Sequence, residues 1–430
     1  MITPVAIAVL PIGEYESDLS RNEAEAMIRV LNELGAILTI SEAAVTEEEA
    51  CQSAEKLLIK APDLLLFIPL RGLSAQMMET AGRMSQQTPC LIWPVQGNFA
   101  LPSSALAVGA LREAGFPVEL FYAPPGDPGT SEMLQPILRA AIACTRLRRS
   151  RVGIIGGLFP NLVSCRYDPQ TVETRLGMTL LPISFAELRD AMHSPPFSIH
   201  EIERSRQEII ASFRVDSADL NALDRGIRLH LALKQIAQGK KLDGFAAECW
   251  SGFPRELGLN PCMGFIEEAY TLACEGDVMS CASLLMVKYL SGSSAYTGDV
   301  YDLDMDGALT LVHCGGPASL ASNPGDVLLT KSKQAMERGF ETMTCRPRID
   351  PGPVILLRFY GRDCDKMHIA MGEVQSSGQS PNLTVKVKLD GNRWDFLGQC
   401  FGNHYIVAAG DFRPALKLLC KWLGISLYET

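Results

Sequence analysis

The sequence predicts an α/β protein with two open parallel-sheet domains of the Rossmann or flavodoxin type, followed by a smaller, mainly β, barrel-like domain. Short, almost wholly apolar runs alternate with amphipathic segments, and this alternation starts again near residue 151. Beyond residue 325 the strand-like runs are joined by connections rich in Gly, Asp and Asn. The predicted domains therefore span residues 1–150, 151–325 and 326–430.

The first 150 residues show the alternation most clearly. The apolar runs that we expect to form strands are residues 5–12, 36–40, 64–70, 90–95 and 118–123. The segments with helical spacing of apolar residues are 22–34, 46–60, 74–84, 103–114 and 131–147. Strands that are apolar along nearly their whole length are typical of a parallel sheet covered by helices on both faces.

The second region opens with a strand that enters a glycine-containing turn, RVGIIGGLFPN. Its further elements are expected to be strands at residues 179–184 and 244–250 and a helix at 223–238. Residues 323–326, Asn-Pro-Gly-Asp, have turn chemistry and mark the start of the β domain. In that domain the expected strands are residues 354–360, 383–389 and 404–410, and the one expected helix is 413–423.

Composition excludes several classes of protein. Of the 430 residues, 47% are hydrophobic and 20% are charged, which is typical of a globular chain with a large core. The net charge of −10 argues against a nucleic-acid partner, and we interpret the basic residues 146–151 as a solvated helix end. Thirteen scattered cysteines without a CxxC pair, and the absence of a signal-like start or a long apolar run, predict a cytoplasmic protein without a membrane partner.

Two acidic positions flank an apolar helix that is predicted to start near Val278 and to end at Gly292. Glu275 and Asp277 precede this helix, where a carboxylate is most simply interpreted as an N-terminal cap. Asp299 follows the helix after a Tyr-Thr-Gly stretch that we expect to be a turn, and an Asp in a turn often binds its own backbone. The chain between the two positions has room for a helix and a returning loop, but spacing alone does not bring them together.

These residues resemble the metal-binding segments of the L-fucose isomerase and L-arabinose isomerase superfamily. The turn at Glu275, the apolar helix and the acid in the Gly-Asp-Val context of Asp299 match the pattern, and the second acid is Asp as in fucose isomerases. The Gly-Asn-His stretch that ends at His404 is similar to the fucose isomerase segment that gives the third metal ligand. Residues 311–316 resemble the short strand that brings a further His, here His313, to the site of arabinose isomerases.

The resemblance implies a metal-dependent aldose–ketose isomerase. It implies that Glu275, Asp299 and His404 bind the metal and that Glu275 and Asp299 are the catalytic groups. It also implies a homo-trimer or homo-hexamer whose active site lies near a subunit interface. The substrate would be a monosaccharide, with a pentose, a 6-deoxyhexose and a hexose that carries an anionic group such as a sulfonate as the alternatives.

The chemistry of such an isomerase explains these residue types. The reaction moves a proton between C1 and C2 of the sugar through a cis-enediol, and a divalent cation stabilises the negative charge on the neighbouring oxygens. Two carboxylates and one neutral imidazole suit Mn²⁺, with Mg²⁺, Co²⁺ or Fe²⁺ as alternatives. A carboxylate beside the reacting carbon can also act as the base.

Four further residues are candidates for substrate binding. Asn403 precedes His404 and could hydrogen-bond the sugar or orient a ligand. His313 lies on an apolar strand and could equally be a core histidine. Glu248 and Trp250 lie at the end of the expected strand 244–250, where open α/β sheets bind ligands, although Trp250 could also belong to the core.

The sequence also bears on other classes of function. The alternative is a non-catalytic sugar-binding or regulatory protein of the same fold, which would need no metal at these residues. A dinucleotide site is not expected, because Gly153, Gly156 and Gly157 lack the GxGxxG spacing. The sequence also contains no GxxxxGK[ST] phosphate loop and no GxSxG nucleophile motif.

Overall fold

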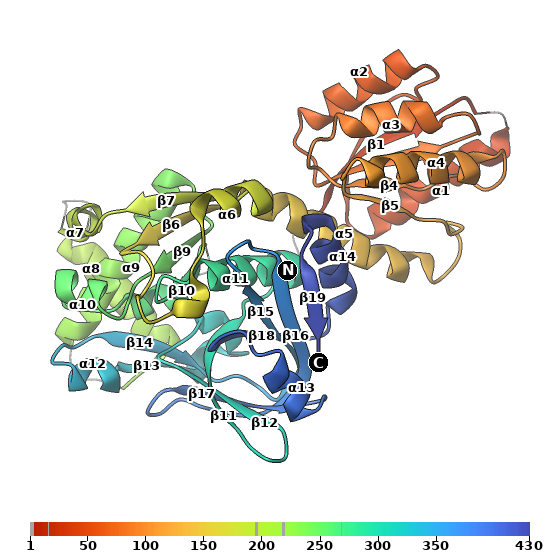
Figure 1. Ribbon diagram of the computed structural model, residues 1–430. Coiled ribbons are helices and arrows are strands. Elements are labelled where there is room, and N and C mark those ends of the chain that lie inside the picture. The colour runs from red at the N-terminus through yellow and green to blue at the C-terminus, as the bar shows by residue number, and fades with distance from the viewer. Residues whose placement is uncertain (1–3, 16, 194–196, 217–219, 268) are drawn as a thin grey trace. The chain divides into compact units, whose positions relative to one another are not determined.

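The computed structural model describes all residues except 1–3, 16, 194–196, 217–219 and 268 (Figure 1). The chain forms two compact units. One comprises Met1–Arg148, Tyr289–Ser291 and Phe412–Gly424, and the other comprises Arg149–Lys288, Gly292–Asp411 and Ile425–Thr430. The predicted division into three domains at residues 150 and 325 stays a prediction.

The N-terminal part of the first unit is a five-stranded parallel sheet with the order β2-β1-β3-β4-β5. Its strands are β1 (Ala6–Ile12), β2 (Ile37–Ile40), β3 (Leu64–Pro69), β4 (Cys90–Ile92) and β5 (Val118–Leu120). Its helices are α1 (Asp18–Glu33), α2 (Glu47–Leu58), α3 (Ala75–Arg83), α4 (Ala100–Glu113) and α5 (Thr130–Arg149). Apolar residues of α2, α3 and α4 pack on one sheet face through Leu10 and Phe67. The predicted alternation of strand and helix is confirmed here.

A second parallel sheet, in the other unit, has the order β10-β9-β6-β7. Its strands are β6 (Arg151–Ile155), β7 (Thr179–Ile183), β9 (Gly244–Ala247) and β10 (Thr271–Cys274). The helices of this region are α6 (Pro169–Leu176), α7 (Phe185–His193), α8 (Ile199–Ser212), α9 (Leu220–Lys240), α10 (Gly252–Leu257) and α11 (Val278–Ser291). The carboxyl ends of parallel strands lie at one edge of a sheet, so the segments that follow β6, β9 and β10 meet there.

Six antiparallel strands of the same unit close into a barrel, because β15 pairs with both β18 and β16 in the order β15-β18-β11-β12-β17-β16. They are β11 (Tyr296–Leu303), β12 (Ala308–His313), β15 (Gly352–Tyr360), β16 (Lys366–Gly378), β17 (Leu383–Leu389) and β18 (His404–Ala409). β19 (Ser426–Glu429) adds to β16 in parallel. The barrel encloses a core that includes Leu309, Leu356 and Val385. The predicted fold class is therefore confirmed.

Smaller elements complete the chain. A three-stranded sheet contains β8 (Arg214–Val215), β13 (Val327–Lys331) and β14 (Met343–Pro347). The remaining helices are α12 (Lys333–Glu337), α13 (Arg393–Gly398) and α14 (Arg413–Leu423), and the short 3₁₀ turns are Val163–Cys165, Pro261–Ile266, Ala318–Leu320 and Pro324–Asp326.

Two expectations about local structure were wrong. The Tyr-Thr-Gly stretch before Asp299 is not a turn, because Tyr296, Thr297 and Gly298 pair with β18 as part of β11. Residues 413–423 are not the one helix after residue 325, because α12 and α13 also form. These two helices are too short to show a helical period in the sequence. β11 and β12, which precede residue 325, belong to the barrel sheet.

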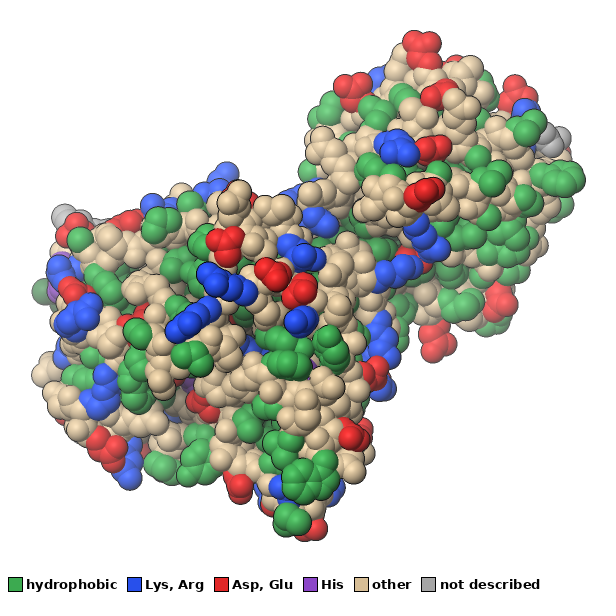
Figure 2. Space-filling view, in the orientation of Figure 1, with side chains coloured by type: hydrophobic (Ala, Val, Ile, Leu, Met, Phe, Trp, Pro, Cys, Tyr) green, Lys and Arg blue, Asp and Glu red, His purple; other side chains and the backbone are tan. Residues whose placement is uncertain are grey.

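Two further features are the distribution of surface charge and the hydropathy of the helices. On the face of each unit that Figure 2 shows, acidic and basic side chains are intermixed. No helix among the described residues is both long enough and apolar enough to cross a membrane.

The turn after β10 is held by a close approach of two backbone segments. Glu275 and Gly276 both have left-handed backbone angles, with φ of 59° and 73°. A Cβ atom on Gly276 would lie 1.8 Å from the carbonyl oxygen of Gly157, in the segment after β6. The amide of Phe159 also donates to the carbonyl of Glu275 at 2.9 Å. A non-glycine residue held at positive φ is strained, and such strain is often found at functional sites.

Gly276→Ala is expected to lower the free energy of unfolding by at least about 2 kcal/mol, because a side chain adds both backbone strain and overlap with Gly157. Denaturant unfolding measures the effect. Gly325→Ala is the matched control in the same unit, since Gly325 has no atom within 4 Å of its Cβ position and its φ lies outside the left-handed region. Equal unfolding midpoints for the two variants would contradict the packing described here.

Candidate functional site

The site is centred on the ring of His404, the first residue of β18. Asp299 is its register partner on the adjacent strand β11. The Nε2 atom of His404 lies 3.5 Å from Oδ1 of Asp299 and 3.7 Å from Oε2 of Glu275, which follows β10. The structure thus brings together the three residues that the sequence proposed as metal ligands, from the parallel sheet and from the barrel.

His313, the last residue of β12, lies beside this group. Its ring centroid is 6.0 Å from that of His404. Glu275, His313 and His404 each offer one possible ligand atom, and these three atoms lie within 4.8 Å of one another. Among the described residues, Nδ1 of His313 and Nε2 of His404 are buried without a hydrogen-bond partner. Buried polar atoms without partners are rare, so this pair indicates a place that a ligand would complete.

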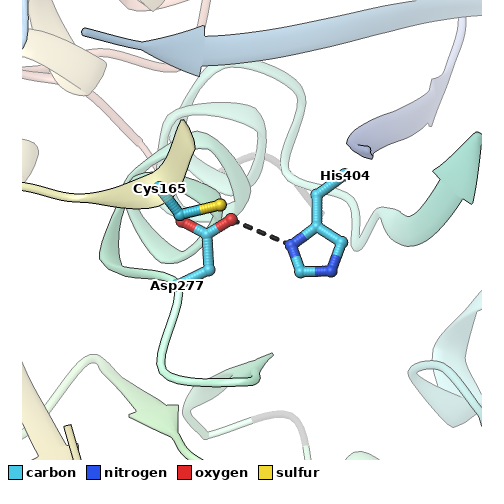
Figure 3. A group of neighbouring side chains, drawn as sticks. All are labelled: Cys165, Asp277 and His404. Carbon is cyan, nitrogen blue, oxygen red and sulfur yellow. Dashed lines mark hydrogen bonds and ion pairs between the residues drawn. The ribbon is translucent and has the colours of Figure 1, made fainter. Parts of the chain in front are cut away.

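Asp277 fixes the orientation of His404. Its Oδ2 accepts a hydrogen bond from Nδ1 of His404 at 2.9 Å (Figure 3). Because a carboxylate only accepts, Nδ1 carries the proton and Nε2 is the atom presented to Glu275 and Asp299. Asp277 is also the N-cap of α11, where its Oδ1 accepts the amides of Met279 and Ser280 at 3.0 and 3.1 Å. The predicted cap is therefore present, and the same side chain holds the histidine.

A second group of possible ligands, Cys165, Asp277 and His404, is drawn in Figure 3. The guanidinium of Arg358 already occupies the cationic position in this group, since Nη1 donates to Oδ2 of Asp277 at 2.7 Å and Nη2 to Sγ of Cys165 at 3.1 Å. Arg358 and Asp277 are both fully buried. We therefore interpret these residues as the support of His404 and not as a metal centre.

Burial and neighbouring charges shift the pKa values of the central residues. Burial, with the charges of Asp299 and Asp277, raises the pKa of Glu275 to about 6, although the proximity of His404 lowers it. Burial lowers the pKa of His313 to about 4, so its ring is neutral. Burial also lowers the pKa of His404, but the hydrogen bond and charge of Asp277 outweigh it and raise the value to about 10. Without a metal, the proton of His404 thus partly offsets the two carboxylates.

A cation at Nε2 of His404 would replace this proton, since metal ions compete with protons for imidazole nitrogen. One oxygen of Glu275 and one of Asp299 each lie within 4 Å of Nε2 of His404, and the Asp277–His404 contact is the carboxylate–histidine arrangement that commonly orients metal ligands. The residues present therefore fit a divalent cation.

Asn403 contacts one of the central carboxylates. Its Nδ2 donates to Oδ1 of Asp299 at 2.6 Å, and its carbonyl accepts the amide of Val300 at 2.7 Å. Asn403 therefore orients Asp299, and a direct contact with substrate stays a prediction.

Glu248 and Trp250 border the site at the end of β9. The carboxylate of Glu248 accepts the amides of Trp250 at 3.1 Å and Ser251 at 2.9 Å, and also that of Gly252. These bonds stabilise the turn into α10, while the negative charge of Glu248 adds to the rise in the pKa of Glu275. Trp250 is half-buried. A substrate contact by either residue stays a prediction.

The sequence alone did not indicate which residues hold His404 in place. Asp277 was recognised as a cap, but nothing in its context indicated the bond to His404 or the ion pair with Arg358, which comes from the distant strand β15. Cys165 gave no signal at all. A fully buried arginine is visible only once the strands around it are in place, because the same residue in a sequence is most often exposed.

No family model matches the chain. It is similar to the sulfoquinovose isomerases of Priestia aryabhattai and Priestia megaterium, with 24% identity over 251 residues in each case. The match covers 55% of this chain and 55% of each relative, so the chain spans about half the length of the curated relatives that it matches.

In metal-free protein, Glu275→Gln is expected to raise the free energy of unfolding by about 2 kcal/mol at neutral pH, because folding raises the pKa of Glu275 from 4.5 to about 6. A carboxyl group with a raised pKa destabilises the fold once it ionises. The gain should therefore be absent below pH 4.5, grow up to about pH 6 and stay constant above that. Denaturant unfolding across this range, with a chelator present, measures it.

The exposed Glu373 of β16 gives the matched control variant, Glu373→Gln, because it makes the same chemical change on the surface. A Glu275→Gln protein as stable as the wild type at every pH would contradict the raised pKa of Glu275.

Proposed function

We propose that the protein is a metal-dependent aldose–ketose isomerase that acts on a monosaccharide, and that its substrate is a sulfonated hexose of the sulfoquinovose type. The observation that supports the proposal most directly is the buried Nε2 of His404, which has no partner among the described residues and faces the carboxylates of Glu275 and Asp299. The names of the similar proteins supply the substrate class and the reaction.

Glu275, Asp299 and His404 would hold the cation, and the neutral ring of His313 is close enough to serve as a further ligand or to contact the sugar. Two carboxylates with imidazole suit Mn²⁺, with Mg²⁺, Co²⁺ or Fe²⁺ as alternatives. When bound, such a cation would act as a Lewis acid that stabilises negative charge on two neighbouring oxygens of the sugar.

The side chains would supply the proton transfers. An aldose becomes a ketose when one proton moves from C2 to C1 through a cis-enediol and another moves between the hydroxyl oxygens. Glu275 and Asp299 would share these roles, because a carboxylate placed beside the reacting atoms can accept a proton and then return it. Asn403 would keep Asp299 in place through their hydrogen bond of 2.6 Å.

We further propose that the protein belongs with the L-fucose and L-arabinose isomerase superfamily, as the motifs around Glu275, Asp299 and His404 suggest. A homo-trimer or homo-hexamer with the active site near a subunit interface, and a cytoplasmic location, remain part of this proposal.

Glu275→Gln and Asp299→Asn are each expected to lower turnover by about 100-fold or more, because each removes a group that transfers a proton. The measurement is proton exchange at C2 of sulfoquinovose in deuterated water with Mn²⁺ present, followed by nuclear magnetic resonance. Asp302→Asn is the matched control, since Asp302 lies on the same strand, is exposed and accepts the amide of its neighbour Leu303. Near-normal exchange by the Glu275 or Asp299 variant would remove that residue from the reaction.

His404→Ala is expected to abolish stoichiometric retention of Mn²⁺, and Asp277→Asn to weaken it by about 10- to 100-fold, since Asp277 acts through the orientation of His404. Elemental analysis after gel filtration and calorimetric titration measure retention and affinity. The exposed His200 of α8 provides the control, His200→Ala. Unchanged metal content in the His404 variant would contradict the proposed centre, and a wild type that retains no metal would favour a sugar-binding protein.

A further inference from the structure

The short helix α12, between β13 and β14, borders the candidate site. Its residue Gln334 accepts a hydrogen bond through Oε1 from Sγ of Cys314 at 2.8 Å, and Cys314 directly follows His313. Arg338, the C-cap residue of α12, lies four positions after Gln334. Residues four positions apart lie on one face of a helix, so Arg338 continues the face that contacts Cys314.

Arg338 also contacts Trp250, which lies just after β9. Its guanidinium carbon lies 4.4 Å from the centre of the Trp250 ring, and Nη2 donates to the Trp250 carbonyl. The Trp250 ring is in turn 5.9 Å from the ring of Phe159, whose amide donates to the carbonyl of Glu275. An unbroken set of contacts therefore connects Arg338 to the turn that carries Glu275.

The charge of Arg338 is not used within the described part of the chain. Its contacts there are a carbonyl and the rings of Trp250 and Phe340, and no carboxylate lies within ion-pair distance. Both lysines near it are paired, Lys331 with Glu341 at 2.7 Å and Lys333 with Glu337 at 3.8 Å. A guanidinium stacked on an aromatic ring is held in place while N–H groups at its edge stay free.

An anionic substrate needs such a group. Glu275, Asp299 and Glu248 place negative charge around the centre, and the chain as a whole carries −10. This potential disfavours a sulfonate, and a cation beside the sulfonate would offset the repulsion. The planar fork of arginine matches the oxygens of an oxyanion better than a lysine does, because it can donate two parallel hydrogen bonds.

We propose that Arg338, held on the face of Trp250, binds the sulfonate of the substrate and determines the selectivity for an anionic sugar. This role rests on the proposed function, because it deepens the assignment of the same site. The sugar diol would be held at Glu275, Asp299 and His404, and the anionic end of the sugar would extend toward α12.

The test compares sulfoquinovose with 6-deoxyglucose, the same hexose without the sulfonate. Arg338→Gln is expected to raise KM for sulfoquinovose by about 10- to 100-fold, as loss of a hydrogen-bonded charge does, with little change in kcat. The kcat/KM for 6-deoxyglucose should stay at the wild-type value. Arg338→Lys should give an intermediate KM, since it keeps the charge and loses the fork. Lys333→Gln is the matched control, because it removes a cation from the same helix that is already paired with Glu337.

Equal losses for the two sugars, or no loss for sulfoquinovose, would overturn the role of Arg338. If the wild type isomerises neither sugar, the proposed function fails, and calorimetric binding of sulfoquinovose in the presence of Mn²⁺ then tests Arg338 separately. Binding by the wild type that weakens at least tenfold in Arg338→Gln would support the sulfonate subsite. Equal binding by both proteins, or no binding by the wild type, would overturn it.

Discussion

The candidate site depends on one buried charge, the carboxylate of Asp277. A fully buried carboxylate is costly unless every lone pair has a partner, and Asp277 meets this requirement with the first turn of α11, Arg358 of β15 and His404 of β18. Each partner comes from a different element, so the single charge ties the helix after the parallel sheet to two strands of the barrel. The ring of His404 has one orientation as a result.

The same region contains two kinds of acid. Asp277 is neutralised by Arg358, and its pKa lies well below the ordinary value because that guanidinium and the bond with His404 outweigh burial. Glu275 and Asp299 have no arginine or lysine partner among the described residues, and the pKa of Glu275 is raised. The charge of Asp277 therefore stabilises the structure of the site, while the charges of Glu275 and Asp299 stay available to a ligand. Functional sites commonly keep such unfavourable charges at some cost in stability.

Much of the fold was readable from the sequence, because parallel strands and their helices have strong local patterns, as at β3 and α9. The central residues were proposed through motifs around Glu275, Asp299 and His404, and the structure brings each of the two carboxylates within 4 Å of His404. What the sequence could not give were contacts between distant elements. The pairing of Asp277 with Arg358 and the approach of Arg338 to Trp250 each join segments that no local pattern relates. The edges of β11 were also misjudged, since a Gly-Asp pair in a strand has the composition of a turn.

Closure of the barrel fixes the spacing of two of the central residues. Asp299 and His404 belong to neighbouring strands of a ring that has no free edge, because β15 pairs on both sides. Their spacing cannot change by a hinge or a sliding strand without breaking the ladder. Any change in the geometry of the three central residues must therefore involve Glu275, which lies in the turn after β10. Asp299 and His404 are thus the fixed side of the centre, and Glu275 approaches them from the parallel-sheet region.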